Sequence, residues 1–233
     1  MKIKYLLAFA ITACMASACK KNSQFPEELP TTAQEADAPL IRDSISYRVD
    51  GITHNVSRHS SWRGSGMYQP YSKVDSIVGN TYYISGIKDS ILYSRNYQIY
   101  DDHPTIEVIF IKTYHTAEMT PNGMRPLNEK ELFTAGARNY AIDFGRDNKQ
   151  NGVAFRFPGG YQTDGSDSFY APQRLSADAQ KDSKFEITSF KKSKSGIYIL
   201  EATFSATAYN DKNESKKIEN GYLRIVAGYL DQQ

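Results

Sequence analysis

Cysteine is almost absent from this chain of 233 residues: there are two, Cys14 and Cys19, and both lie near the start. Everything after Cys19 therefore has neither a disulfide nor a thiolate metal ligand. The fold must be stabilised by its core alone. The four histidines do not supply a metal site either. His54 and His59 are five residues apart, which fits neither one face of a strand nor the i, i+4 pair of a zinc-binding helix.

A long apolar run and an excess of charge are also missing. The apolar stretch at residues 5–18, which follows Lys2 and Lys4, is shorter than the ~20 residues of a membrane-spanning helix and is typical of a secretory leader. Lys+Arg number 28 and Asp+Glu 26. The leader contains two lysines and no acid, so its removal leaves a neutral chain. Such a chain has no field to attract polyanions, which argues against a nucleic-acid partner.

Either cysteine could end the leader. Ile11-Thr12-Ala13-Cys14 has the branched apolar residue favoured at the third position before the cysteine. Ala16-Ser17-Ala18-Cys19 stands where the apolar run stops and Lys20 begins, whereas a cut at Cys14 would leave a hydrophobic stub at residues 15–18. The segment resembles a bacterial lipoprotein signal. The resemblance implies that residues 1–18 are removed, that Cys19 is lipidated and that the mature chain is anchored to a membrane. The alternatives are an ordinary cleaved leader or a free buried cysteine.

Residues 19–42 differ in composition from the rest. Pro26, Pro30 and Pro39 recur among Glu, Gln, Thr and Ala with little periodic apolar content. This composition predicts a flexible tether, with partial packing along the domain as the alternative. The predicted organisation is therefore a leader at 1–18, a tether at 19–42 and a single β-rich domain at 43–233.

The domain has the composition and patterning of β-strands. The whole chain has 17 Tyr and 11 Phe, and most of them lie in this domain, where they suit half-buried pleated strands. Asp50-Gly51 predicts a two-residue hairpin turn. Residues 106–113 are apolar on both faces, which indicates a central strand. The clearest alternation places one set of side chains on a buried face: Tyr198, Leu200, Ala202, Phe204, Ala206 and Ala208.

Helical signals are few. A short helix is predicted to begin after Asn128, which would be its N-cap. Glu131, three residues later, would reach back to the cap, and Gly136 would end the helix. A last strand is expected over residues 216–230, broken near 219–221, and residues 59–71 are expected to form a loop. These patterns predict an all-β fold, either an antiparallel β-sandwich or a partly open barrel, with one or two short helices.

Several of these segments resemble small lipoproteins of Bacteroidota. The likeness rests on the Cys-Lys-Lys start at residue 19, the Asp-Gly hairpin, Asn-Glu-Lys-Glu-Leu-Phe-Thr-Ala-Gly at 128–136, Phe-Glu-Ile-Thr at 185–188, Glu-Ala-Thr-Phe-Ser-Ala-Thr-Ala-Tyr at 201–209 and Ile-Glu-Asn-Gly at 218–221. The resemblance implies an exported, lipid-anchored β domain of the cell envelope, at the outer membrane, on its periplasmic or its surface face. It supplies no active site.

Two groups of residues are candidate ligand-binding sites. Trp62, Arg63, Tyr68 and Tyr71 could form an aromatic surface for a glycan or peptide, because flat rings with polar neighbours suit such contacts. The alternative is that Trp62 plugs one end of the core. Asp164 and Asp167 could bind a hard cation, but calcium-loop spacing is absent and a turn capped by its own side chains explains the same residues. No metal site is therefore predicted.

A tripeptide occurs three times, centred on Ser44, Ser76 and Ser90. Asp43-Ser44-Ile45, Asp75-Ser76-Ile77 and Asp89-Ser90-Ile91 resemble the Asp-Ser/Thr-apolar acceptor for O-glycosylation of exported Bacteroidota proteins. The alternative is a turn followed by the first apolar residue of a strand.

Recognisable catalytic and cofactor motifs are absent: neither a nucleophile elbow nor a phosphate loop nor a dinucleotide fingerprint occurs. We therefore expect a non-enzymatic binding or structural module of the envelope, without a cofactor, whose partners are the membrane through its anchor and a glycan or an envelope protein. The alternative is an envelope glycan or peptide hydrolase that uses a pair of carboxylates.

Overall fold

The computed structural model describes residues 42–58, 62–68, 73–78, 81–85, 89–99, 105–123, 125–144, 149–165 and 175–231. All of them belong to one compact unit, Leu40–Gln233. The elements in chain order are β1 (Asp43–Val49), β2 (Ile52–Arg58), β3 (Trp62–Tyr68), β4 (Lys73–Val78), β5 (Thr81–Ser85), β6 (Ser90–Ile99), β7 (Ile106–His115), η2 (Thr116–Glu118), η3 (Glu129–Phe133), β8 (Gly136–Arg138), β9 (Gly152–Phe157), η4 (Pro158–Gly160), β10 (Tyr161–Gln162), β11 (Lys184–Lys192), β12 (Tyr198–Tyr209) and β13 (Ser215–Gly228).

Eleven of the strands form a single antiparallel sheet. Its order is β2-β1-β13-β12-β10-β9-β7-β6-β3, with β11 paired to β12 and β8 to β11, while β4 and β5 form a separate hairpin. No pairing among the described strands closes this path into a barrel. The longest helix in the described part has five residues, and none there is long and apolar enough to span a membrane. The predicted all-β fold is confirmed.

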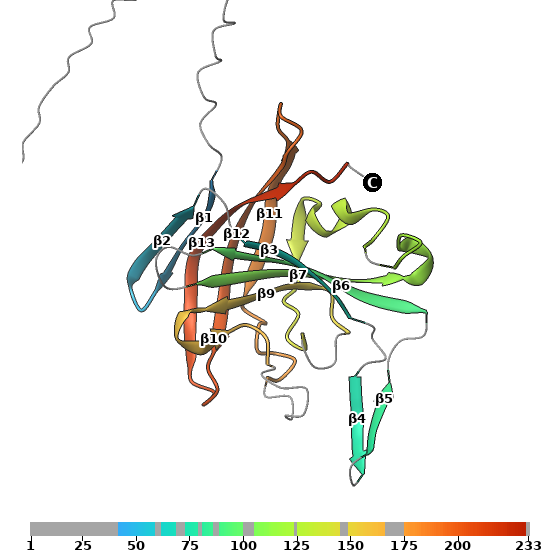
Figure 1. Ribbon diagram of the computed structural model, residues 1–233. Coiled ribbons are helices and arrows are strands. Elements are labelled where there is room, and N and C mark those ends of the chain that lie inside the picture. Colours follow the sequence, from blue (N-terminus) through green and yellow to red (C-terminus); the bar gives the residue numbers. More distant parts are fainter. Residues whose placement is uncertain are drawn as a thin grey trace, which may run out of the picture. The chain divides into compact units, whose positions relative to one another are not determined.

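The sheet bends over on itself to give two layers (Figure 1). Strands β1, β13, β12 and β11 run side by side, and β9, β7 and β6 cross them. The bend lies at β10, whose Gln162 pairs with Arg156 of β9 and with Tyr209 of β12. The preceding turn needs glycine, because Gly159 and Gly160 both have φ 76. This corner positions the cavity described below.

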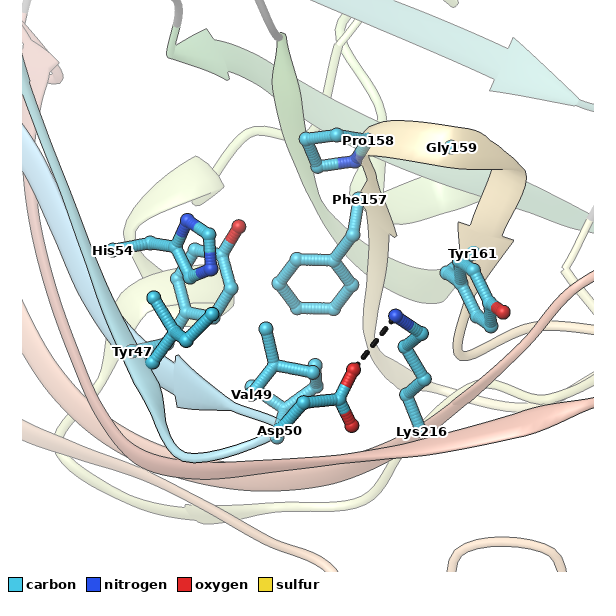
Figure 2. A pocket seen from close by; sticks show the side chains of 11 residues that line it. Tyr47, Val49, Asp50, His54, Phe157, Pro158, Gly159, Tyr161 and Lys216 are labelled. Atoms are coloured by element: carbon cyan, nitrogen blue, oxygen red, sulfur yellow. Dashed lines mark hydrogen bonds and ion pairs between the residues drawn. The ribbon is translucent and has the colours of Figure 1, made fainter.

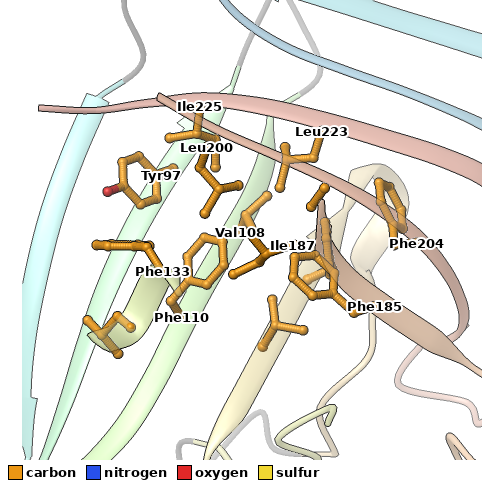
Figure 3. Packing of buried hydrophobic residues seen from close by; sticks show 14 of the residues in the cluster. Tyr97, Val108, Phe110, Phe133, Phe185, Ile187, Leu200, Phe204, Leu223 and Ile225 are labelled. Atoms are coloured by element: carbon orange, nitrogen blue, oxygen red, sulfur yellow. The ribbon is translucent and has the colours of Figure 1, made fainter. Parts of the chain in front are cut away.

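The core fills the space between the layers and is rich in aromatic rings (Figure 3). Phe110 from β7 contacts Phe133 of η3 at 5.2 Å between ring centroids. Phe155 from β9 stacks on Phe204 of β12 at 4.6 Å, so the two layers meet ring on ring. The predicted alternation of β12 is confirmed: from Leu200 to Ala208 the even-numbered side chains are buried in the core.

The central position of β7 is confirmed as well. Val108 and Phe110 face the main core, whereas Ile109 and Ile111 belong to a second apolar cluster on the opposite face of the sheet. That second cluster is covered by residues 141–144 and includes Phe144. A strand buried on both faces explains the unbroken apolar run in its sequence.

The β1–β2 hairpin forms as predicted. Asp50 and Gly51 have φ 51 and φ 79, which is the pair of positive angles that a type I′ turn requires. The register places Ile45 opposite Val56, and Ile45 and Tyr47 are buried in the core. The Asp50-Gly51 turn thus sets the register between β1 and β2.

The helix predicted after Asn128 is instead a 3₁₀ helix, and it is not capped. The Asn128 amide donates to the Glu131 side chain at 3.0 Å rather than accepting from the backbone. Gly136 does not end the helix but begins β8, where it pairs with Ile187 of β11. Asn128 and Glu131 were predicted to cap the backbone at the start of the helix. Their side chains bond to each other instead, so no side chain caps the backbone.

Two further expectations are wrong. The break expected at residues 219–221 is a bulge: β13 runs through, and Asn220 takes up the irregularity with φ 51. The loop expected over residues 59–71 contains a strand, because β3 pairs with β6 along its whole length, from Trp62 opposite Gln98 to Tyr68 opposite Leu92.

Candidate functional site

The predicted ligand residues are only partly placed. Trp62, Arg63 and Tyr68 belong to strand β3 by their backbone pairing. Their side chains, and Tyr71 altogether, lie outside the described residues. A glycan or peptide surface at these positions therefore stays a prediction.

The Asp-Ser-Ile tripeptides occupy different settings. Asp89 has φ 54 and Ser90 begins β6, as the turn-then-strand alternative expects. Asp43 instead begins β1 with a buried carboxylate that accepts a hydrogen bond from the Val226 amide. Ser44 follows it and is half-buried. The third serine, Ser76, lies within β4, and its side chain is outside the described residues. Modification of the three serines stays a prediction.

Asp164 is fully buried. Its carboxylate lies 3.6 Å from the Arg156 guanidinium, which also contacts Glu107 at 3.1 Å. The proposed companion Asp167 lies outside the described residues. Within the described part, no three His, Cys, Asp or Glu residues gather as a metal site would require. An ion pair with an arginine accounts for the placement of Asp164.

A cavity of about 450 Å³ lies in the described part. Three segments surround it: the β1–β2 hairpin, the corner from β9 to β10, and the start of β13 (Figure 2). Its lining residues are Tyr47, Val49, Asp50, Ile52, His54, Phe157, Pro158, Gly159, Tyr161, Lys216 and Ile218. Most of this lining is apolar, and four of the residues carry rings of aromatic type.

The rings are held in place by one another. Tyr47 stacks against His54 with 5.1 Å between centroids and meets Phe157 at 5.2 Å. Tyr47 and Phe157 are buried, so they form the floor of the cavity. His54 is exposed at its rim. Ile52 is the most exposed large apolar side chain described, at 63%, and it also stands at the rim.

One ion pair is the charged feature of the cavity. Lys216 Nζ lies 2.8 Å from Asp50 Oδ2 and 5.1 Å from the centre of the Tyr161 ring. The hydrogen bond to Asp50 raises the pKa of Lys216, so the ammonium is fully charged at neutral pH. Burial raises the pKa of Tyr47, so its hydroxyl is neutral there. The cavity thus combines an apolar floor with a lysine–aspartate ion pair at its edge.

The sequence shows why these segments adopt their shapes, but not that they meet. The Asp-Gly turn fixes the hairpin, and Pro158-Gly159-Gly160 fixes the corner. Asp50 and Lys216 are separated by 166 positions, so their contact depends on how β13 pairs with β1. The one available signal was Ile52, an apolar residue directly after a turn.

A second cavity of about 360 Å³ is polar. It lies between β7, η3 and β8, and its walls include Lys112, Glu131 and Arg138. Lys112 is bonded to Glu131. That contact lowers the pKa of the Glu131 carboxyl. A carboxylate held ionised by a lysine is suited neither to general-acid chemistry nor to a neutral ligand.

Comparison with known proteins adds no candidate ligand: no family model, no curated protein and no solved structure matches the chain.

Proposed function

We propose that the protein is a lipid-anchored, non-enzymatic binding module of the cell envelope, and that the cavity between the β1–β2 hairpin and the β10 corner holds its ligand. The observation that carries this proposal is the aromatic floor of the cavity. Tyr47 and Phe157 are buried yet line an open space of about 450 Å³. Ligand sites are concave, mostly apolar and of roughly 300–1,000 Å³.

The chemistry of the walls indicates the ligand class. Phe157 points its ring into the cavity in Figure 2, and Ile218 and Val49 extend the apolar surface. An ammonium has three donors, and Asp50 accepts from one of them. Lys216 can therefore also donate to an oxygen of a ligand. The best fit is a small molecule with an apolar ring or chain and an anionic group at one end.

Ile52 gives a direct test of the site. Ile52→Asp removes apolar surface from the rim and places a negative charge near the anionic end of the ligand. The probe is 1-anilinonaphthalene-8-sulfonate, an aromatic anion, whose fluorescence rises when it leaves water. We expect the variant to bind the probe at least about five-fold more weakly. This loss corresponds to about 1 kcal/mol of binding free energy, because ~1.4 kcal/mol is a tenfold change in affinity.

The matched control is Leu127→Asp. Leu127 is 48% exposed, and it does not line this cavity. Both changes are on the surface, so each should leave the free energy of unfolding within ~0.5 kcal/mol. Equal probe affinities for the two variants, with both folded, would place the ligand site elsewhere.

The anchor is tested separately. We expect metabolic palmitate labelling of the wild type and of Cys14→Ala, and none of Cys19→Ala, because Cys19 ends the leader. Labelling that disappears in Cys14→Ala and persists in Cys19→Ala would move the lipid to Cys14. A wild type that takes up no label would remove the anchor from the proposal.

Glycan binding at Trp62 and its neighbours stays a second hypothesis. Titration of Trp62 fluorescence with envelope polysaccharides tests it directly, because the chain has one tryptophan. The hydrolase alternative also stays a prediction. The two cavities above and two others in the described part each contain a single carboxylate, so nothing there favours it.

A further inference from the structure

We propose that the tip of the β11–β12 hairpin, together with the C-terminal segment beside it, is a surface that contacts anionic phospholipid. The tip consists of residues 191–197, and the neighbouring segment contributes Tyr229 and Asp231. The proposal goes beyond ligand binding: it assigns the face that the domain turns toward the membrane. It relies on the proposed anchor only for its biological setting, because the contact is measured without lipidation.

The first observation is position. Across the sheet, Ser44 pairs with Arg224, Arg224 with Glu201, and Glu201 with Ser189, so these four residues stand at one level. The hairpin continues about five residues past that level to Gly196, which at ~3.3 Å per residue is roughly 15 Å. Figure 1 shows the tip of the β11–β12 hairpin rising on the side where β1 begins. The first strand, β1, therefore begins at the end of the sheet from which the tip projects.

The second observation is charge. Lys191, Lys192 and Lys194 are exposed at the tip, and Lys130 of η3 lies beside it. Among the described residues, the exposed acid that contacts them is Asp231, at 2.6 Å from Lys192 and 2.8 Å from Lys130. A single carboxylate shared by two lysines leaves this group clearly positive. A positive surface complements the negative surface potential of anionic lipids.

An aromatic side chain completes the surface. Tyr229 is 55% exposed, and its ring lies against the tip, where a Cβ on Gly196 would be 3.7 Å from the Tyr229 Cε1 atom. Tyrosine suits the boundary between lipid and water, because its ring is apolar and its hydroxyl is polar. Lysine and tyrosine together are the composition of an interfacial contact.

The opposite end of the sheet provides the contrast. The β1–β2 and β12–β13 turns lie there, and their described charges balance: Asp50, Asp211 and Glu214 against Lys212, Lys216 and Lys217. The ligand cavity opens at this balanced end. A membrane contact through the hairpin tip would therefore leave the cavity facing away from the bilayer and accessible.

The test compares two double variants of the chain from Lys20 to Gln233, which contains every described residue of the sheet and core. Binding is measured by co-sedimentation with vesicles of phosphatidylcholine alone and of phosphatidylcholine mixed with phosphatidylglycerol. We expect the wild type to prefer the anionic vesicles and to lose that preference at about 1 M salt, where the screening length is ~3 Å. Each lysine near a surface is worth about five-fold in affinity, so Lys191→Ala/Lys194→Ala should bind about 25-fold more weakly.

The control, Lys212→Ala/Lys217→Ala, removes the same charge from the opposite end and should change binding less than about two-fold. Equal losses in the two double variants, or a wild type without preference for anionic vesicles, would overturn the proposal. The tip variant should keep its affinity for 1-anilinonaphthalene-8-sulfonate, and Ile52→Asp should keep its affinity for vesicles. Failure of the membrane surface and failure of the ligand site are thereby distinguished.

Discussion

Phe204 and Gly221 form the most informative pair in the core, because each residue explains the other. They pair directly between β12 and β13. The Phe204 ring lies over Gly221, so that a Cβ there would approach the ring to 2.5 Å. On its other side, the ring stacks on Phe155 at 4.6 Å. Glycine is needed at 221 for space and not for backbone conformation, since its φ is not positive.

Three variants test this pair: Phe204→Ala, Gly221→Ala and the double substitution. Phe204 is 4% exposed, so Phe204→Ala should cost ~3–5 kcal/mol, a large part of a typical stability of ~5–15 kcal/mol. Gly221→Ala should cost ~1–3 kcal/mol, because the added methyl group forces the ring to move. In the Phe204→Ala background the same methyl enters vacated space. There it should be neutral or stabilising by up to ~1 kcal/mol, because alanine loses less entropy than glycine.

Urea denaturation of the four proteins gives the coupling free energy, expected at ~1–3 kcal/mol in favour of the double variant. Should Phe204→Ala not fold, Phe204→Leu keeps the cycle measurable. Thr203→Ala, on the exposed face of the same strand, is the control and should cost less than ~1 kcal/mol. Additive costs for Phe204→Ala and Gly221→Ala, or equal midpoints for Phe204→Ala and Thr203→Ala, would refute the packing described here.

The sequence predicted those parts of the fold that local chemistry decides. The Asp50-Gly51 turn is read directly from residues that tolerate positive φ. The face of β12 follows from strict alternation around Phe204, and the central place of β7 follows from an apolar run on both faces. In each case a few neighbouring residues carry the whole signal.

The errors have physical causes of their own. Glu-Asn-Gly at 219–221 is a turn sequence, but pairing with β1 and β12 on both sides keeps the strand intact and confines the irregularity to Asn220. The segment around Asn128 has the residues of a capped helix, but it is too short, and the Asn128 amide bonds to Glu131 instead. Strand pairing outweighed the turn propensity of residues 219–221, and a side-chain contact outweighed the capping propensity of Asn128.

The candidate sites were beyond local reasoning. The cavity joins Tyr47, Phe157 and Lys216, which come from three distant segments and meet because β13 lies beside β1. The lysines at 191–194 are visible in the sequence, yet their position beyond the start of β1 follows from the register across β13 and β12. The sequence analysis named neither group of residues as a site, because only the strand pairing brings the members of each group together.

Two hydrogen-bonded groups give further predictions. Tyr140→Phe should cost ~1–3 kcal/mol, because the buried hydroxyl donates to the Ser205 carbonyl at 2.8 Å. Burial raises the pKa of Tyr140, so the loss should be the same from pH 6 to about pH 9, and a cost below ~0.5 kcal/mol in urea denaturation would contradict it. Asp231→Asn should also destabilise the fold, because Asp231 ties the C-terminal segment to Lys130 and Lys192. Hydrogen bonds from these lysines hold the pKa of Asp231 well below its usual range. A depressed folded-state pKa contributes stability that is present above the unfolded value of ~3.9 and is lost as the pH falls below it. The urea denaturation midpoints of the wild type and of Asp231→Asn should therefore differ at pH 7 and converge as the pH is lowered below about 4. A difference that persists undiminished at low pH would show that the Asp231 charge does not hold the C-terminal segment in place.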